Sequence, residues 1–446
     1  MSDGKTLPHS GIPAGPRNPW REICAASIGN ALEFYDLLIY GYFAIVIGKL
    51  FFPTADPTNS LLLSVASFGI SFVTRPFGAI ILGGYADKAG RKASLTLSIT
   101  LMMLGTAMIA LAPTYAQIGI AAPLIVVVAR MIQGFSTSGE FGAATAFMVE
   151  HASAEKRGFF SSWQMSTQGL ATVLAAGISA FLSWQLTDVQ ISEWGWRVAF
   201  AIGLLIGPVG LYIRRSIDET ADFKKLSAAQ KAKSPIREVF AVNGSNMFLG
   251  AGVVAAATAF NYVHKVYMPT FAIKQLHLPA TSSFLSAVVT GVILMITAPM
   301  VGAMSDHYGR YKVMGIALSL IAITTYPLFF LLTTFPTVTT LMFVQAIVGL
   351  LLAGALGPVS ALLADIFPTK TRGTGLALSY NFSVTIFGGF APLIVTWLIE
   401  TLHNKVSPSF YVMATAAISL TALVMLAKKM KSSRFSVSPA SVTSTI

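Results

Sequence analysis

The sequence predicts an all-α membrane protein with twelve transmembrane helices in two pseudo-symmetric six-helix bundles. The first observation is the composition: 54% of the 446 residues are hydrophobic and 11% are charged, whereas soluble domains carry about a quarter charged residues. The second is that apolar stretches long enough to cross a bilayer recur along the chain. The third is a charged turn that occurs once in each half.

The apolar stretches predict six spans in each half of the chain. Those of the first half cover residues 23–49, 60–84, 93–112, 120–149, 158–184 and 196–213, and those of the second half cover 245–272, 281–303, 313–333, 338–364, 373–399 and 408–427. The predicted domains are an N-terminal tail (1–21), a first bundle (22–213), a linker (214–244) with a short surface helix, a second bundle (245–427) and a C-terminal tail (428–446). The N-terminal tail lacks the apolar core of a cleavable signal peptide.

Basic residues alternate along the chain. They gather in the N-terminal tail, after every even-numbered span and at the C-terminus, while the intervening loops hold few. Because basic loops stay in the cytoplasm, this pattern predicts a cell-membrane protein with both termini in the cytoplasm. The same placement of charge explains the net charge of +12 without a nucleic-acid partner.

The charged turn marks the duplication. The first copy, GGYADKAGRK, runs from Gly83 to Lys92, and the second, GAMSDHYGRYK, begins at Gly302. In the first copy, Gly83 and Gly90 allow a tight bend, with Asp87 and Arg91 as its charged pair.

A second repeated pattern supports the same division of the chain into two halves. Glu150 precedes an Arg-Gly pair at Arg157, and Asp365 precedes one at Arg372, each by seven residues. Two similar six-span halves joined by a linker describe a transporter that rocks around a site at the middle of the membrane.

Several motifs resemble a known family. They are GNALEFYD from Gly29, RPFGAIILGGYADKAGRK from Arg75, RMIQGFSTSGEFG from Arg130, EWGWR from Glu193, RRSIDET from Arg214 and IFGGFAP from Ile386. Together with the six-plus-six layout, they resemble the major facilitator superfamily, and within it the metabolite–proton symporters. That family transports citrate, tricarballylate, 2-oxoglutarate, shikimate and proline or betaine with protons. The resemblance implies proton-coupled uptake by a monomer.

Charged residues also occur inside the predicted spans. They are Glu33, Asp36, Arg75, Arg130, Glu140 and Lys265. Each costs about 2.5–3.5 kcal/mol at the centre of a helix that faces lipid. Since three are acidic and three are basic, we expect them to balance one another in a central cavity.

The acids are the candidates for proton coupling. Glu33 and Asp36 are three residues apart and share a helix face. Two carboxylates so close in a medium of low dielectric constant repel each other, so one of them can hold a proton. Glu140 is the third candidate, and the resemblance implies that Arg130 pairs with the first-span acids. The alternative is that the acids stay ionised and paired with Arg75 or Arg130, with Glu140 in a structural contact.

The basic residues are the candidates for substrate binding. Arg75 presents a fork that grips a carboxylate, and Lys265 adds a positive charge from the second half. Two cations on opposite halves suit a substrate with two or more carboxylates. The alternatives are a structural ion pair for Arg75 and a Lys265 side chain that snorkels to the outer surface.

Uncharged polar residues complete the predicted site. They are Asn261, four residues before Lys265, and Gln164, Gln168, Tyr380 and Asn381. Each can bind substrate or, equally well, a neighbouring helix.

The two charged turns are expected to act as gates. Asp87 can cap the N-terminus of a helix in the opposite half, where the helix dipole favours an anion, and Arg91 can hold Asp87 or a neighbouring acid. Asp306 and Arg310 are the counterparts in the second half. We expect them to act more weakly, because His307 replaces the usual basic residue of the family motif.

The motifs that are missing exclude other functions. The sequence holds no phosphate-binding G-x-x-x-x-G-K-[ST] loop, no metal-ligand spacing and no nucleophile–base motif. We therefore expect no enzyme activity, cofactor or metal. The favoured substrate is a di- or tricarboxylate such as citrate or 2-oxoglutarate, and the first alternative is a shikimate-like monocarboxylate, proline or betaine. A solute receptor, a passive channel and a proton-driven exporter are the remaining alternatives.

Overall fold

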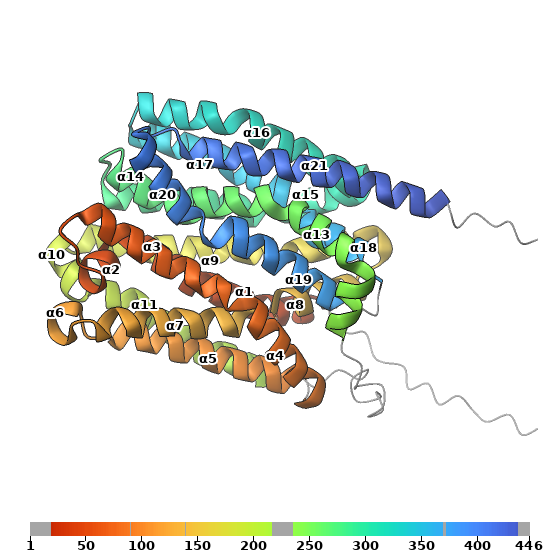
Figure 1. Cartoon of the computed structure of the whole chain (residues 1–446), viewed down its shortest axis with the longest axis horizontal. Coiled ribbons are helices and arrows are strands. Elements are labelled where there is room, and N and C mark those ends of the chain that lie inside the picture. The colour runs from red at the N-terminus through yellow and green to blue at the C-terminus, as the bar shows by residue number, and fades with distance from the viewer. Residues whose placement is uncertain (1–18, 90, 139, 216–234, 369–371, 436–446) are drawn as a thin grey trace, which may run out of the picture.

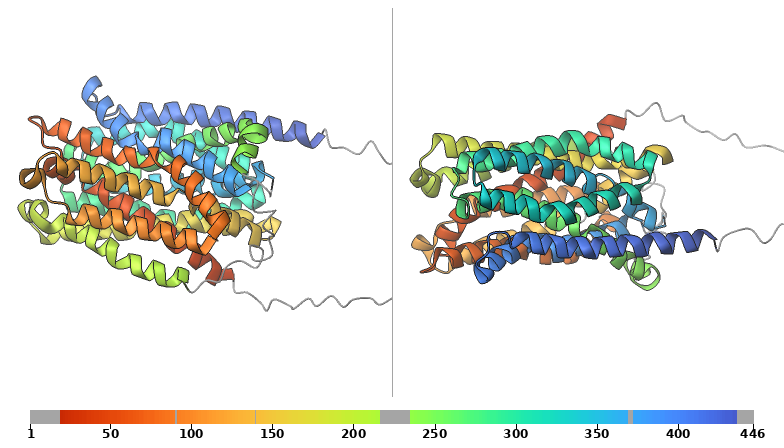
Figure 2. Two further views of the ribbon diagram at one scale, coloured as in Figure 1. Left: turned by 60° about the horizontal axis from the view of Figure 1, so that its bottom comes forward. Right: turned by 90° about the horizontal axis from the view of Figure 1, so that it is seen from above.

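The computed structural model describes residues 19–89, 91–138, 140–215, 235–368 and 372–435, and the regular structure of these residues is helical. The helices lie side by side along the long direction of the molecule (Figure 1). Helices of the first half form one side of the assembly and helices of the second half form the other. The two further views show the same division (Figure 2).

The first half makes six passes. They are α1 (Pro19–Tyr42) with α2 (Ala44–Phe51), α3 (Pro57–Val73) with α4 (Arg75–Ala89), α5 (Arg91–Leu111), α7 (Ala121–Thr137) with α8 (Glu140–His151), α9 (Arg157–Gln185) and α11 (Trp196–Arg215). The connections hold the short helices α6 (Tyr115–Ile118), α10 (Asp188–Gln190), η1 (Ala154–Lys156) and η2 (Ile191–Gly195).

The second half also makes six passes. They are α13 (Pro235–Asn261) with the π-helix η3 (Tyr262–Tyr267) and α14 (Met268–Lys274), α15 (Ala280–Tyr308), α16 (Arg310–Thr334), α17 (Val338–Leu356) with α18 (Val359–Ile366), α19 (Arg372–Ser383) with the π-helix η4 (Val384–Gly389) and α20 (Ala391–Leu402), and α21 (Pro408–Phe435).

The helices have the length and hydropathy of membrane spans. Within the described residues, eight helices are long and apolar enough to cross a bilayer, and the pair at 30–42 and 44–51, bent by 63°, makes a ninth. Two shorter apolar helices at 96–111 and 121–137 and α11 complete the twelve. The predicted all-α fold of twelve transmembrane helices is confirmed.

Three helices extend beyond the predicted spans. The first helix begins at Pro19 and α13 begins at Pro235, both inside segments predicted to be polar, and α21 runs to Phe435, past the predicted end at 427. Hydropathy locates only the apolar part of a helix, whereas these helices continue as polar turns beyond it. The predicted surface helix of the linker lies outside the described residues.

Several spans are interrupted near the middle of the membrane. The break between α3 and α4 comes at Thr74, and Pro76 explains it, because a proline cannot donate the next helical hydrogen bond. Pro358 stands at the break between α17 and α18, while η3 and η4 interrupt two further spans. Irregular backbone at this depth is tolerated where protein buries it or where it lines a cavity, so the interrupted spans mark the centre of the molecule.

The two halves meet most closely along α9 and α15. A Cβ atom added at Gly158 would lie 2.5 Å from the carbonyl oxygen of Gly302, and one added at Gly169 would lie 2.7 Å from that of Gly291. Ser166 also donates a hydrogen bond to the carbonyl of Met295 at 2.6 Å. Small residues thus let the two backbones touch, as is usual for helix packing in membranes.

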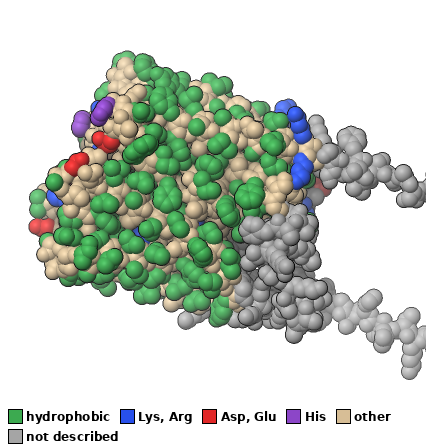
Figure 3. All heavy atoms as spheres, in the orientation of Figure 1, with side chains coloured by type: hydrophobic (Ala, Val, Ile, Leu, Met, Phe, Trp, Pro, Cys, Tyr) green, Lys and Arg blue, Asp and Glu red, His purple; other side chains and the backbone are tan. Residues whose placement is uncertain are grey.

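The surface matches a membrane location. Hydrophobic side chains cover the middle of the molecule in Figure 3, Lys and Arg gather at the end where α21 finishes, and acidic and His side chains gather at the opposite end. We call the former the basic end. The site described below lies between the two ends, where the interrupted spans meet.

Candidate transport site

A buried ion pair lies at the centre. The Nη2 atom of Arg75 is 3.1 Å from Oε1 of Glu33, with side-chain exposures of 4% and 6%. Tyr262 and Tyr380, both from the second half, lie within electrostatic reach of the two charges. Of the predicted alternatives, the structure shows the ion pair for this state of the molecule.

The Arg130 side chain heads a hydrogen-bonded chain. Arg130 donates to Gln133 Oε1 at 2.8 Å, Gln133 donates to Thr106 Oγ1 at 2.9 Å, and Thr106 donates to Oδ2 of Asp36. Arg130 also donates to Ser71 Oγ at 3.2 Å. The implied ion pair between Arg130 and a first-span acid is therefore absent among the described contacts. Two neutral side chains relay the contact instead, and the buried Oδ1 atom of Asp36 has no hydrogen-bond partner among the described residues.

Aromatic rings cover both guanidinium groups. Arg75 lies 4.3 Å from the ring centroid of Phe72, and Arg130 lies 4.4 Å from that of Tyr40 and 5.2 Å from that of Phe68. The Tyr262 ring meets Phe72 edge-on at 5.4 Å. Cations placed over aromatic faces are stabilised electrostatically, so these rings help to hold both guanidinium groups in the protein interior.

Lys265 is fully buried, so it does not snorkel to the surface. Its Nζ atom lies 5.0 Å from the ring centroid of Phe34, next to Glu33 on α1, and has no hydrogen-bond partner among the described residues. Tyr42 donates to the Lys265 carbonyl at 3.1 Å, which ties this segment to α1. No described contact joins Lys265 to Arg75.

Asn261 lies four residues before Lys265, directly before the π-helix η3 begins at Tyr262. Asn261 is buried, and its Oδ1 atom has no hydrogen-bond partner among the described residues.

The remaining polar residues hold helices together. Gln164 accepts from Thr145 at 2.6 Å within the first half, and Asn381 donates to the carbonyl of Ser138 at 2.9 Å across the halves. Tyr380 stacks on Phe141, with ring centroids 3.6 Å apart. The buried Nε2 atoms of Gln164 and Gln168 have no hydrogen-bond partner among the described residues.

The cavity at the site is small. The space between Glu33, Asp36, Arg75 and Arg130 has a volume of about 20 Å³, which is space for about one water molecule. Aromatic pairs also join the two halves: Phe141 stacks on Tyr380, and Tyr42 meets Phe284 with ring centroids 5.6 Å apart.

The charged turn of the second half caps a helix of the first. The backbone N–H groups of Gly158 and Phe159, at the start of α9, donate to Asp306 at 2.8 and 2.9 Å. Arg310 lies 3.1 Å from Asp306 and also pairs with Asp365. The acid-to-helix contact that the sequence predicts for Asp87 is thus present at Asp306, despite His307, because the backbone donors need only the carboxylate.

Other predicted residues lie outside the described part. Gly90 is not described, and nothing is described of the side chains of Asp87, Arg91 and Glu140 or of the surroundings of Gly83. Within the described residues, no group of three or more His, Cys, Asp or Glu side chains is placed to hold a metal ion.

Comparison with known proteins identifies the family. Residues 22–246 match the model described as "Sugar (and other) transporter", and residues 266–443 match "Major Facilitator Superfamily". A citrate–proton symporter of Klebsiella pneumoniae is 35% identical over 91% of this chain and 91% of its own length. The chain belongs to the major facilitator superfamily. The resemblance found in the motifs is confirmed, and members of this family are transporters, not enzymes.

Further relatives and a solved structure are similar over most of the chain. A proline/betaine transporter of Salmonella typhimurium is 33% identical over 90% of this chain and 82% of its own length. A crystal structure of a D-xylose–proton symporter superimposes with a TM-score of 0.73 at 18% identity, covering 91% of this chain and 97% of that one. The structural match confirms the fold.

Sequence reasoning missed three polar residues of the site. Thr106 and Ser71 are hydroxyl residues in apolar helices, and Tyr262 is one of 13 tyrosines. Such residues are common in membrane helices, where they usually bond their own backbone. Thr106 gave no signal of its own in the sequence, because its role depends on the packing of α5 beside the span that carries Arg130 and Gln133.

Proposed function

We propose that the chain imports a small organic acid, with a di- or tricarboxylate such as citrate or 2-oxoglutarate favoured, by proton symport. The observation that carries the proposal is the arrangement of two buried cations on opposite halves. Arg75 is neutralised by Glu33, and Lys265 has no anionic partner among the described residues. A substrate with at least two carboxylates would neutralise both cations once Glu33 takes up a proton.

The ion pair supplies the coupling. Removing one partner of a buried pair costs about 3–5 kcal/mol, because the other charge is left uncompensated. Protonation of Glu33 alone is therefore unfavourable, and so is substrate binding to an Arg75 that is still paired. Proton and substrate bind together, and the neutralised site lets the two bundles rock to the other side. The predicted bundles, residues 22–213 and 245–427, would be the rocking units.

Asp36 and Arg130 have a second role in this proposal. Their link through Gln133 and Thr106 joins α1, α5 and α7. A change in the charge of Asp36 would therefore alter the hydrogen bonds of Arg130. Asp36 is then an additional proton site inside the first half. Glu140 remains a candidate for coupling.

The orientation and assembly are part of the proposal. Basic loops stay in the cytoplasm, so the basic end and both termini would face the cytoplasm of a bacterial inner membrane. Asp306 and Arg310, with Asp87 and Arg91 as their counterparts, would then close the cytoplasmic side. The transporter would act as a monomer.

A specific observation favours one second candidate, proline or betaine. The rings of Tyr40, Phe68 and Phe72 lie around the site, and aromatic faces bind quaternary ammonium groups. In this case Arg75 would bind the single carboxylate and Lys265 would not be needed. A shikimate-like acid would likewise need only Arg75 to bind its single carboxylate.

The test is uptake into proteoliposomes under an imposed inward proton gradient. Labelled citrate, 2-oxoglutarate, shikimate and proline are compared in the unmodified protein, Arg75→Ala and Lys265→Ala. We expect gradient-dependent uptake of citrate or 2-oxoglutarate that both substitutions abolish. Uptake of proline or shikimate alone, unaffected by Lys265→Ala, would refute the polycarboxylate assignment and leave the symport in place.

A further inference from the structure

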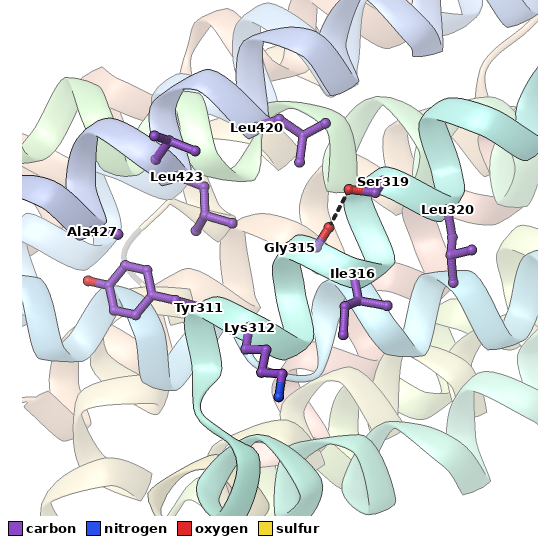
Figure 4. Close-up of a pocket in the computed structure, with 10 residues that line it drawn as sticks. Tyr311, Lys312, Gly315, Ile316, Ser319, Leu320, Leu420, Leu423 and Ala427 are labelled. Atoms are coloured by element: carbon purple, nitrogen blue, oxygen red, sulfur yellow. Dashed lines mark hydrogen bonds between the residues drawn. The ribbon is translucent and has the colours of Figure 1, made fainter.

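A groove of about 490 Å³ runs between α16 and α21 (Figure 4). It lies far from the transport site, on the outer surface of the second half. Lys312, Gly315 and Ile316 line it from α16, and Leu420, Leu423 and Val424 line it from α21. The two helices run antiparallel here, so Tyr311 and Ala427 lie at the same end of the groove.

Glycine creates the depth of the groove. Gly315 presents no side chain toward α21, and a Cβ atom built there would lie 3.5 Å from Cδ2 of Leu423, with no other heavy atom within 4 Å. A larger residue would therefore be accommodated by extending into the groove. Gly315 and, one turn further, Ser319 are the small residues of α16 that line the groove.

The groove faces hydrocarbon. The membrane windows of α16 and α21 are only 39% buried, and Ile316 and Val424 are 54% and 53% exposed. Both helices are long and apolar enough to cross the bilayer, so these exposed side chains contact lipid. An elongated apolar channel on such a surface fits an acyl chain.

The lysines at one end of the groove favour an anionic lipid headgroup. Lys312 lines the groove at its basic end, and the exposed Lys428 follows Ala427 and lies one turn beyond Val424 on the same face of α21. No acidic residue lines the groove. We propose that the groove binds one anionic phospholipid, with an acyl chain between α16 and α21 and the phosphate beside Lys312 and Lys428.

The first test is native mass spectrometry of the full chain in detergent, titrated with dioleoyl phosphatidylglycerol or dioleoyl phosphatidylcholine. We expect one phosphatidylglycerol to bind more tightly than phosphatidylcholine. Lys312→Gln and Lys428→Gln should each weaken it about fivefold, which corresponds to about 1 kcal/mol for a lysine near an anionic surface. Lys429→Gln is the matched control, because it removes the same charge at a position away from the groove. The Nζ atom of Lys429 donates a hydrogen bond to Ser245 on α13.

The second test fills the groove. Gly315→Leu should abolish binding of the single tight lipid, whereas Gly177→Leu, which adds the same side chain where no heavy atom lies within 4 Å, should leave it unchanged. Equal binding of the two lipids would overturn the proposal. So would equal binding to the two leucine variants, or a loss in Lys429→Gln as large as that in Lys312→Gln.

Discussion

Replacing the buried Lys265 by methionine should stabilise the protein and abolish polycarboxylate transport. The ammonium group is fully buried and has no hydrogen-bond partner among the described residues. Its only described compensation is the Phe34 ring at 5.0 Å, which is worth about 2 kcal/mol when desolvated. Methionine fills a similar volume and carries no charge.

The magnitude follows from the cost of a buried unsatisfied polar group. That cost is about 1–3 kcal/mol, and more for a charged group. Because the substitution also removes the contact with the Phe34 ring, Lys265→Met should gain about 1 kcal/mol net. The apparent unfolding temperature in detergent should rise by a few degrees. In proteoliposomes, the same variant should lose uptake of the di- or tricarboxylate, because the second cation is gone.

The control is Lys49→Met on the exposed surface of α2. Substitutions at such positions usually change stability by less than about 0.5 kcal/mol, and uptake should be unaffected. The assay is thermal unfolding of both variants beside uptake at saturating substrate. A fall in the unfolding temperature of Lys265→Met, or unchanged polycarboxylate uptake, would refute the idea that Lys265 is a cation held ready for substrate.

Three further predictions concern the ion pair, the gate and the interface. Glu33→Gln, which mimics the protonated acid, should keep substrate exchange between two equal pools but lose proton-driven accumulation. Asp306→Asn should weaken the cap on α9 by about 1 kcal/mol, because an amide offers one acceptor oxygen where the carboxylate accepts with both, and it should increase the labelling of cysteines introduced at the basic end. Gly302→Val should reduce the folded yield and transport, because a Cβ atom there would lie 2.6 Å from the carbonyl oxygen of Gly158.

Each of these has a contrary outcome. Full accumulation by Glu33→Gln would show that another acid carries the proton, and Asp36→Asn would be compared next. Unchanged labelling in Asp306→Asn would mean that Arg310 and Asp365 hold the gate without it. Normal yield for Gly302→Val, beside the control Gly177→Val, would show that α9 and α15 can separate at little cost.

The fold could be predicted from hydropathy because lipid imposes one rule on every span. A helix must satisfy its own backbone and present about 20 apolar residues, and the duplicated turns then divide the chain. The interruptions could not be predicted in the same way. Pro76 gives a local signal for the break beside Arg75, but nothing in the sequence of 262–267 distinguishes a π-helix from an α-helix.

The charged residues of the candidate site could be predicted from the sequence, but the contacts that each of them makes could not. The sequence identifies charged residues inside apolar spans, because a charged side chain that faces lipid is costly and must instead face the protein interior. They are Glu33, Asp36, Arg75, Arg130 and Lys265. Which acid meets which base depends on helix rotation, which the sequence leaves open. The contact between Arg130 and Asp36 also passes through Thr106, a residue type too common in membrane helices to be recognised.

Proton movement coupled to substrate is the central claim, and it can be measured directly. A pH-sensitive dye trapped in proteoliposomes reports proton entry when citrate or 2-oxoglutarate is added outside without an imposed gradient. We predict acidification of the interior that depends on the substrate and is absent in Glu33→Gln. Uptake of the same substrate without any change in internal pH would contradict the proposed symport.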